Sequence, residues 1–391
     1  MSWLRGVSVV VLLAATSACS GGESESEKPA LSGATALSVG LNSSCALIND
    51  GSVRCWGSNF NGLLGLGSSE TSAWAAIRVE RVADAIGVAV ANGHACAALA
   101  DGSVKCWGAL PTRLRTKPPP SRAMSVEEVT AAQAVAAGRE HTCALQSGGT
   151  VQCWGNTSLA SLGDGSLPDD PRPWSRVASV ADLSDATAIV ANDGTSCALL
   201  GSGELECWGD VWVDGDTLDD ESLAGRTWLT TATKPKLIEG LPRAVGIGIA
   251  DLYGCAVLED STVACWGLLR KEMGGTGQPS VIPTTVAGLS DVTAIATGDS
   301  HACALLHDGS IRCWGSNLGG QLGDGSEVAS PDPVRVQGID TAVAIAAAGY
   351  ANCALLADST VRCWGLNALG CSDSDGRCRN SAVPVVVRAE R

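Results

Sequence analysis

The feature that most constrains the fold is a short motif that recurs seven times in this chain of 391 residues. Each copy has Cys-Ala followed, ten residues after the first cysteine, by Cys-Trp-Gly. Successive first cysteines lie 47 to 58 residues apart, a period typical of propellers and solenoids, whose neighbouring units bury each other's faces. The seven pairs are Cys45 and Cys55, Cys96 and Cys106, Cys143 and Cys153, Cys197 and Cys207, Cys255 and Cys265, Cys303 and Cys313, and Cys353 and Cys363.

Within each repeat, the residue pattern is that of β-strands. The residue two positions before the second cysteine is always aliphatic, and turn signals such as Asn49-Asp50-Gly51 lie between the cysteines. A three-residue loop ending in glycine predicts a bulged hairpin, and this register places Cys45 opposite Cys55, within disulfide range. Ser261 and Ser359 replace the turn glycine in two repeats and leave the geometry of those turns open. Seven pairs of buried free thiols are the alternative to seven bridges.

The 17 cysteines indicate an oxidising compartment outside the cytosol. Fourteen belong to the repeats, and Cys371 and Cys378 lie close enough in sequence to be predicted as a further pair. Cys19 is then the odd cysteine, without a predicted partner.

The first residues read as an export signal. Arg5 precedes an apolar stretch, residues 6–15, that is too short to span a bilayer. The sequence Thr16-Ser17-Ala18-Cys19 resembles the lipobox of bacterial lipoproteins, although that family usually has leucine where Thr16 stands. We therefore expect residues 1–18 to be a signal peptide and Cys19 to carry a lipid. Plain secretion after cleavage near Ala18 is the alternative.

Residues 19–33 are predicted to form an acidic, Ser- and Gly-rich tether. The expected location is the bacterial cell envelope, with the outer membrane favoured. The lipid is then the only predicted contact with the membrane.

The segment from His301 to Asp324 resembles a repeat of the regulator of chromosome condensation (RCC1) family, through its His, Ala-Leu, Trp-Gly, Asn and Gly-Gln-Leu-Gly elements. The resemblance implies an all-β, seven-bladed propeller over residues 34–391, with four antiparallel strands in each blade. A Pro/Val-rich strand precedes the inner repeats but not the first one, and the chain ends with such a strand at residues 383–387. We therefore predict that this C-terminal strand completes the first blade and closes the ring.

Candidate chemistry is sparse. The net charge of −15 argues against a nucleic-acid partner. A metal site formed by His94, His141 and His301 competes with a simpler role, hydrogen bonding inside each blade, which the family pattern implies. Acidic loops around residues 210–221 and 373–375 could hold calcium, but neither has a calcium-loop pattern, and solvated loops explain them as well. No cofactor and no catalytic residue are predicted.

The predicted function is therefore non-enzymatic: a monomeric binding or scaffold protein whose loops contact another protein or a surface polymer. The Gly-Gln-Leu-Gly-like loop is clear in repeats one, three and six, and the divergent loops are where a specific partner could bind. Aromatic residues in loops are candidate contacts, although packing within blades would also explain them. These candidates are Phe60, Trp74, Trp174, Trp212 and Trp228. An exported enzyme with an unrecognised site, for example a carbohydrate-active one, is the alternative. The nucleotide exchange of the founding nuclear member is not expected outside the cytosol.

Overall fold

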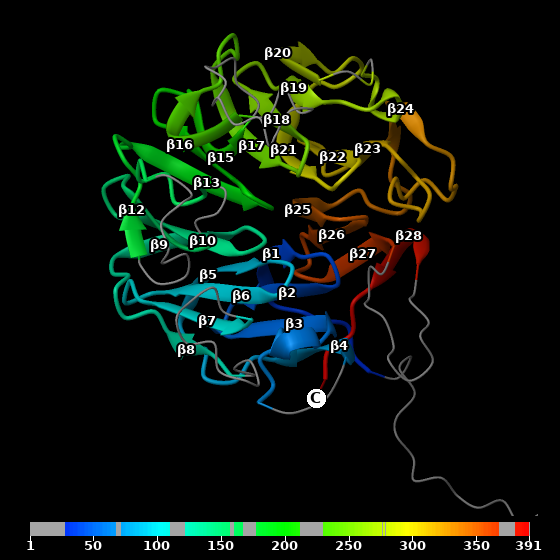
Figure 1. Cartoon of the computed structure of the whole chain (residues 1–391). Coiled ribbons are helices and arrows are strands. Elements are labelled where there is room, and N and C mark those ends of the chain that lie inside the picture. Colours follow the sequence, from blue (N-terminus) through cyan, green and yellow to red (C-terminus); the bar gives the residue numbers. More distant parts are fainter. Residues whose placement is uncertain are drawn as a thin grey trace, which may run out of the picture.

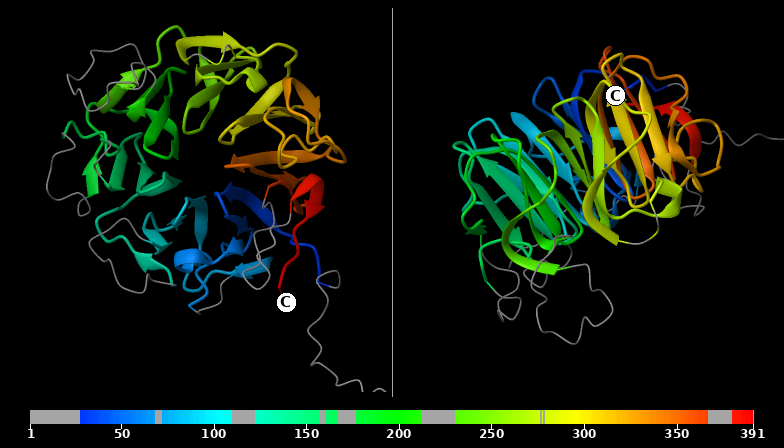
Figure 2. Two further views of the ribbon diagram at one scale, coloured as in Figure 1. Left: turned by 45° about the vertical axis from the view of Figure 1, so that its right-hand side comes forward. Right: turned by 90° about the horizontal axis from the view of Figure 1, so that it is seen from above.

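The computed structural model describes residues 28–67, 72–109, 122–156, 160–166, 177–211, 230–275, 277, 279–366 and 380–390. Their strands form seven four-stranded antiparallel sheets arranged as blades around a central axis (Figures 1 and 2). The predicted all-β, seven-bladed propeller is confirmed. Within these ranges, no helix has the length and apolar character that crossing a bilayer would require.

Each blade begins with its inner strand and ends with its outer strand. Blades 1 and 2 contain β1 (Ala34–Val39), β2 (Ser43–Ile48), β3 (Val53–Ser58), β4 (Ser72–Arg78), β5 (Ala85–Val90), β6 (His94–Leu99), β7 (Val104–Gly108) and β8 (Met124–Ser125). Blades 3 and 4 contain β9 (Ala132–Ala137), β10 (His141–Gln146), β11 (Val151–Gly155), β12 (Val177–Ser179), β13 (Ala186–Asn192), β14 (Thr195–Leu200), β15 (Leu205–Val211) and β16 (Thr230–Leu237).

The other three blades repeat this order. Blades 5 and 6 contain β17 (Ala244–Ile249), β18 (Tyr253–Leu258), β19 (Val263–Leu268), β20 (Pro279–Thr285), β21 (Val292–Thr297), β22 (His301–Leu306), β23 (Ile311–Gly315) and β24 (Ser330–Arg335). Blade 7 contains β25 (Ala342–Ala348), β26 (Ala351–Leu356), β27 (Val361–Gly365) and β28 (Ser381–Val386). Two short 3-10 helices, η2 (Phe60–Gly62) and η4 (Lys271–Met273), follow the third strands of blades 1 and 5.

The central hairpin of each blade has the predicted register. Cys45 lies directly opposite Cys55 in the pairing of β2 with β3, and the turn glycine Gly51 has a φ of +74°. Ser261 and Ser359 take the same left-handed conformation at φ +64° and +62°. The two turns without glycine therefore keep the geometry of the others.

A disulfide joins the two opposed cysteines in every repeat, in place of the alternative of free thiols. The Cα atoms of each pair lie 4.0 to 4.1 Å apart. The bridges join Cys45 to Cys55, Cys96 to Cys106, Cys143 to Cys153, Cys197 to Cys207, Cys255 to Cys265, Cys303 to Cys313 and Cys353 to Cys363. The other three cysteines, Cys19, Cys371 and Cys378, lie outside the described residues, so their predicted lipidation and pairing stay predictions.

The hydrophobic core is divided into seven clusters, and each cluster spans two blades. In every case the tryptophan of one blade's Cys-Trp-Gly sequence is buried among residues of the preceding blade. Trp107 of blade 2, for example, packs with Leu63 and Leu64 of blade 1. Trp56 of blade 1 packs in the same way with Cys353 and Cys363 of blade 7. The apolar core therefore runs around the whole ring and joins its first blade to its last.

The closure of the ring differs from the prediction. The C-terminal strand β28 pairs with β27 and completes the seventh blade, and the outer strand of the first blade is its own β4. The Pro/Val-rich segment thus follows the Cys-Trp-Gly strand of its own blade and forms that blade's outer edge. The first blade's segment, residues 72–78, contains no proline, so it was not recognised as the same element.

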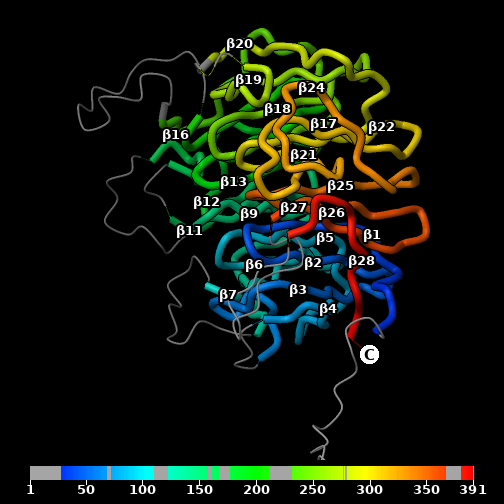
Figure 3. Tube along the Cα trace, turned by 90° about the vertical axis from the view of Figure 1, so that its right-hand side faces the viewer, coloured from blue at the N-terminus to red at the C-terminus, as the bar shows by residue number. Residues whose placement is uncertain are grey.

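The chain ends nevertheless meet where the ring closes. Residues beyond β28 cross to the first blade, where the Ala76 backbone N–H donates to the Arg388 carbonyl at 2.7 Å (Figure 3). On the other side of this segment, the Leu31 N–H donates to the Val387 carbonyl at 2.8 Å, and Lys28 Nζ lies 2.8 Å from Glu390 Oε1. Residues 28–33, predicted as part of the tether, therefore pack on the propeller, with Leu31 fully buried.

Candidate partner-binding face

One face of the ring carries the connections from first to second strands and from third to fourth strands; we call it the mouth face. The residue four positions before the first cysteine of each repeat lies in the first of these connections. All seven of these residues line a cavity of about 330 Å³ at this end of the axis. They are Leu41, Asn92, Arg139, Asp193, Asp251, Asp299 and Gly349. A single repeat position thus becomes a ring of side chains around the opening.

Three consecutive blades place aspartates in this ring; we call Asp193, Asp251 and Asp299 the acidic sector. Burial raises the pKa of Asp299 above its usual value, and the nearby charge of Asp193 raises it further. The positive charge of Arg270 and a backbone hydrogen bond from Gly349 lower the same pKa. Arg139 Nη1 lies 3.6 Å from Asp193 Oδ1. The cavity is therefore lined by three carboxyl groups on one side, where Arg139 also lines it and Arg270 acts on Asp299.

Exposed apolar side chains occupy the other side of the mouth face, on blades 6, 7 and 1. Leu318 is 84% exposed and Phe60 is 70% exposed. Tyr350 and Leu41, closer to the opening, are 40% and 36% exposed. We call these four residues the apolar sector. Side chains of this size left open to water on one face are typical of a contact surface for another molecule.

The aromatic residues proposed as partner contacts have different positions. Phe60 lies in η2, within the connection between β3 and β4 of blade 1, and is highly exposed. Trp74 lies in the outer strand β4 and is half-buried, so it contributes partly to packing within the blade. Trp174, Trp212 and Trp228 lie outside the described residues, as do the acidic residues at 214–221 and 373–375.

The three repeat histidines do not form a metal site. No group of three or more metal-binding side chains occurs in the described ranges. His94, His141 and His301 instead bond to the next blade, which corrects the expected bond within a blade. Their Nε2 atoms lie 2.7, 2.7 and 2.8 Å from Thr142 Oγ1, Ser196 Oγ and Asn352 Oδ1 respectively. Burial lowers the pKa of His94 and of His301 to about 4 and that of His141 to about 3, so all three are neutral at pH 7.

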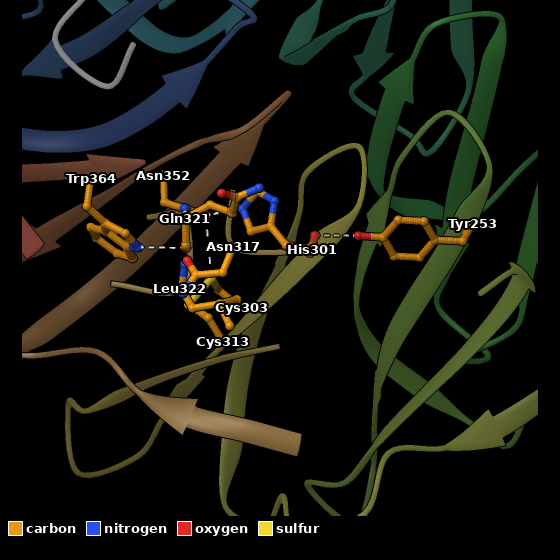
Figure 4. Close-up of a disulfide and its surroundings, with 9 residues drawn as sticks. All are labelled: Tyr253, His301, Cys303, Cys313, Asn317, Gln321, Leu322, Asn352 and Trp364. Carbon is orange, nitrogen blue, oxygen red and sulfur yellow. Dashed lines mark hydrogen bonds between the residues drawn. A yellow bond between two sulfur atoms is a disulfide. The ribbon is translucent and has the colours of Figure 1, made fainter. Parts of the chain in front are cut away.

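The Gly-Gln-Leu-Gly-like loops also join blades. Trp364 Nε1 of blade 7 donates to the Gln321 carbonyl in the loop of blade 6 at 3.0 Å (Figure 4). The loops of blades 1 and 3 accept equivalent bonds: Trp107 Nε1 donates to Leu63 O and Trp208 Nε1 to Ser161 O. The backbone carbonyls of these loops hold neighbouring blades together, while Phe60 and Leu318 in the same connections remain exposed.

Sequence reasoning missed this role of the histidines, although the sequence contains a signal for it. Each of the three histidines precedes a repeat that has a hydrogen-bonding residue just before its first cysteine, namely Thr142, Ser196 or Asn352. Where the next repeat has alanine or glycine at that place, the preceding repeat has no histidine. Comparing these two positions between successive repeats would have indicated a bond across the blade boundary.

The family follows from these repeats. A model described as "Regulator of chromosome condensation (RCC1) repeat" matches residues 34–63, 132–159 and 292–321, and a second model of the same description matches residues 308–355. The chain contains RCC1 repeats. The first three matches cover blades 1, 3 and 6, the same blades whose loops bind the next tryptophan. None of the curated protein sequences compared with the chain matches it.

Solved structures show the same RCC1-like architecture. The crystal structure of human WBSCR16 is 17% identical with a TM-score of 0.73, and the match covers 87% of this chain and 95% of that one. A chain in the crystal structure of Kap60 bound to yeast RCC1 (Prp20) is 19% identical with a TM-score of 0.67, covering 81% and 78%. Another structure, of Prp20p from Saccharomyces cerevisiae, was described together with that protein's binding to Gsp1p and histones; it is 19% identical with a TM-score of 0.66, covering 80% of each chain. At these identities the likeness concerns the fold alone.

Proposed function

We propose that this RCC1-repeat protein is a non-enzymatic binding protein of the cell envelope, which contacts a partner protein through its mouth face. The observation that carries the proposal is the apolar sector beside a polar opening. Phe60 and Leu318 expose most of their surface on this face, and large apolar side chains of this kind dominate the energy of protein interfaces. The binding to Gsp1p and histones named for yeast Prp20p is in keeping with a protein partner.

Seven disulfides support a location outside the cytosol, because thiols are kept reduced in that compartment. In this proposal a lipid on Cys19 holds the protein at the bacterial envelope. Labelling cells with a clickable fatty acid tests the anchor: the wild-type protein should be labelled and a Cys19→Ser variant should not. Label on the variant, or none on the wild type, would contradict the anchor and leave the proposed binding face untouched.

The binding face is tested by photo-crosslinking in the cells that produce the protein. A photoreactive amino acid at position 60 or 318 should give a discrete crosslinked protein. The same amino acid at position 282 or 383, where exposed apolar residues lie on the outer strands β20 and β28, serves as the matched control. Crosslinks of equal yield from both sets of positions, or none from 60 and 318, would contradict a partner protein at the mouth face. Crosslinks to a polysaccharide instead would favour a surface polymer.

A further inference from the structure

The mouth face is divided into two regions of different chemistry. The acidic sector lies on blades 4, 5 and 6, and the apolar sector lies on blades 6, 7 and 1. Both sectors border the same cavity. Asp193 of the acidic sector and Leu41 of the apolar sector occupy the same repeat position, and each lines the cavity. A ligand at the opening would therefore touch carboxylates on one side and apolar side chains on the other.

The apolar sector is continuous across the place where the ring closes. In blade 1, the Ser58 N–H donates to the Asn42 carbonyl at 2.9 Å and joins the connection that carries Phe60 to the one that carries Leu41. The Leu41 side chain lies against Gly349 of blade 7. The contact is so close that a Cβ atom added to Gly349 would be 2.7 Å from Leu41 Cδ2. Within blade 7, Tyr350 lies between β25 and β26, and Leu366 follows β27. A backbone hydrogen bond of 3.0 Å from the Leu366 N–H to the Tyr350 carbonyl joins these two connections.

From there the same surface reaches blade 6. An added Cβ at Gly319, beside Leu318, would lie 2.7 Å from Leu366 Cβ. The four apolar side chains thus follow one another along neighbouring connections. They therefore lie on connections that contact one another in turn from blade 1 to blade 6.

The charges that face the cavity leave the acidic sector with a negative excess. Arg139 is paired with Asp193, and Arg270 acts on Asp299. Glu140, which accepts a hydrogen bond from Asn156 Nδ2 at 2.5 Å, lines a neighbouring pocket that also includes Arg139 and Asp193. Among the described residues, three carboxyl groups and one guanidinium group line the cavity, in a protein whose net charge is −15. Complementarity favours a cationic ligand and disfavours nucleic acid.

We propose that the mouth face binds a basic, amphipathic segment of a partner protein, with its apolar side chains on the apolar sector and a lysine or arginine in the axial cavity. This inference rests on the proposed function and specifies the chemistry of the partner. A cavity of about 330 Å³ admits a long side chain but not a whole secondary-structure element, whose diameter is about 10 Å for a helix. The apolar sector is the surface left for the rest of the segment.

The test uses two synthetic peptides on the full mature chain: one of alternating lysine and leucine, and one in which glutamate replaces every lysine. The lysine peptide should bind and the glutamate peptide should not. Asp251→Asn combined with Asp299→Asn should weaken the lysine peptide about tenfold and reduce the salt dependence of its binding. A photoreactive group on the peptide should crosslink to residues 40–42, 316–320 and 349–350.

The matched control is Asp260→Asn combined with Asp308→Asn, which removes the same two charges from hairpin turns on the opposite face. Equal weakening by both double variants, binding of both peptides, or crosslinks mainly away from the mouth face would overturn the inference. If the inference is overturned in this way but positions 60 and 318 still crosslink a partner in cells, the proposed function stands without the inferred basic segment. If the peptide binds as expected but no cellular partner is crosslinked, the proposed function fails instead.

Discussion

His301 Nε2 lies 2.8 Å from Asn352 Oδ1, across the boundary between the sixth and seventh blades. Each disulfide, in contrast, closes a hairpin inside a single blade. The two kinds of link therefore act at different levels: sulfur fixes each hairpin, while hydrogen bonds and buried tryptophans hold the hairpins in a ring. Figure 4 shows both at one boundary, with the bridge between Cys303 and Cys313 beside the contact of His301 with Asn352.

The bond between His301 and Asn352 should contribute measurably to stability. In a double-mutant cycle of His301→Ala and Asn352→Ala, denaturant unfolding should give a coupling of about 1 kcal/mol, because the pair is fully buried. The exposed pair Arg335 and Asp340 is the control and should couple by less than about 0.5 kcal/mol. Equal coupling in the two pairs would contradict a special role for the buried contact.

The buried histidines should make the protein sensitive to acid. Their pKa values of about 3 to 4 in the fold lie below the ordinary 6.5, so between pH 6.5 and about 4 the unfolded chain binds protons that the folded chain does not. Stability should therefore be complete above pH 6.5 and fall as the pH is lowered through this window. Replacing all three histidines by asparagine should flatten that part of a melting-temperature profile. An unchanged slope would show that other groups cause the acid sensitivity.

Gly323 should contribute to stability at the point where its loop meets the next blade. It has a φ of +66°, and an added Cβ would lie 2.9 Å from Trp364 Cδ1. Gly288 has a similar φ of +76° with no atom within 4 Å, so Gly288→Ala measures backbone strain alone. Gly323→Ala should destabilise the protein by about 1 to 3 kcal/mol more than Gly288→Ala, because the methyl group forces the packing apart. Equal losses in thermal unfolding would mean that the tryptophan contact is unimportant.

Ring closure should depend on the residues that follow β28. Deleting residues 388–391 removes the backbone bonds to Ala76 and to residue 29, and should lower the melting temperature clearly. Leu31→Ala should also cost about 2 to 4 kcal/mol, because this side chain is only 1% exposed. Val383→Ala, at an outer position 39% exposed, should change stability by about 0.5 kcal/mol or less. A deletion that melts like the wild type would show that the apolar core alone closes the ring.

Much of the fold could be predicted because the repeated sequence determines both the hairpin and the number of its copies. The spacing of Cys45 and Cys55 around a glycine turn determines the hairpin register, and seven copies determine the number of blades. The starting point of each sheet could not be predicted in the same way. A periodic sequence defines its period but not which strand begins a blade. The outer strand of the first blade, residues 72–78, was not recognised because it lacks the proline and valine of outer strands such as β24 and β28.

The candidate site was only partly predictable. Phe60 was correctly placed at an exposed loop, but the acidic sector was missed. Asp193, Asp251 and Asp299 lie 48 to 58 residues apart in sequence, and only the closed ring brings them around one opening. The role of the histidines was hidden for the same reason, since each partner lies in the following repeat.

The bridges have one more consequence, for how the protein matures. Both cysteines of a pair belong to a single hairpin and are ten residues apart, so they can meet as soon as that short stretch has entered an oxidising space. An oxidase acting on the chain as it enters the oxidising space would encounter the proper partner first each time. Such an order of arrival would favour the native pairs over crosswise pairs among the fourteen similar thiols.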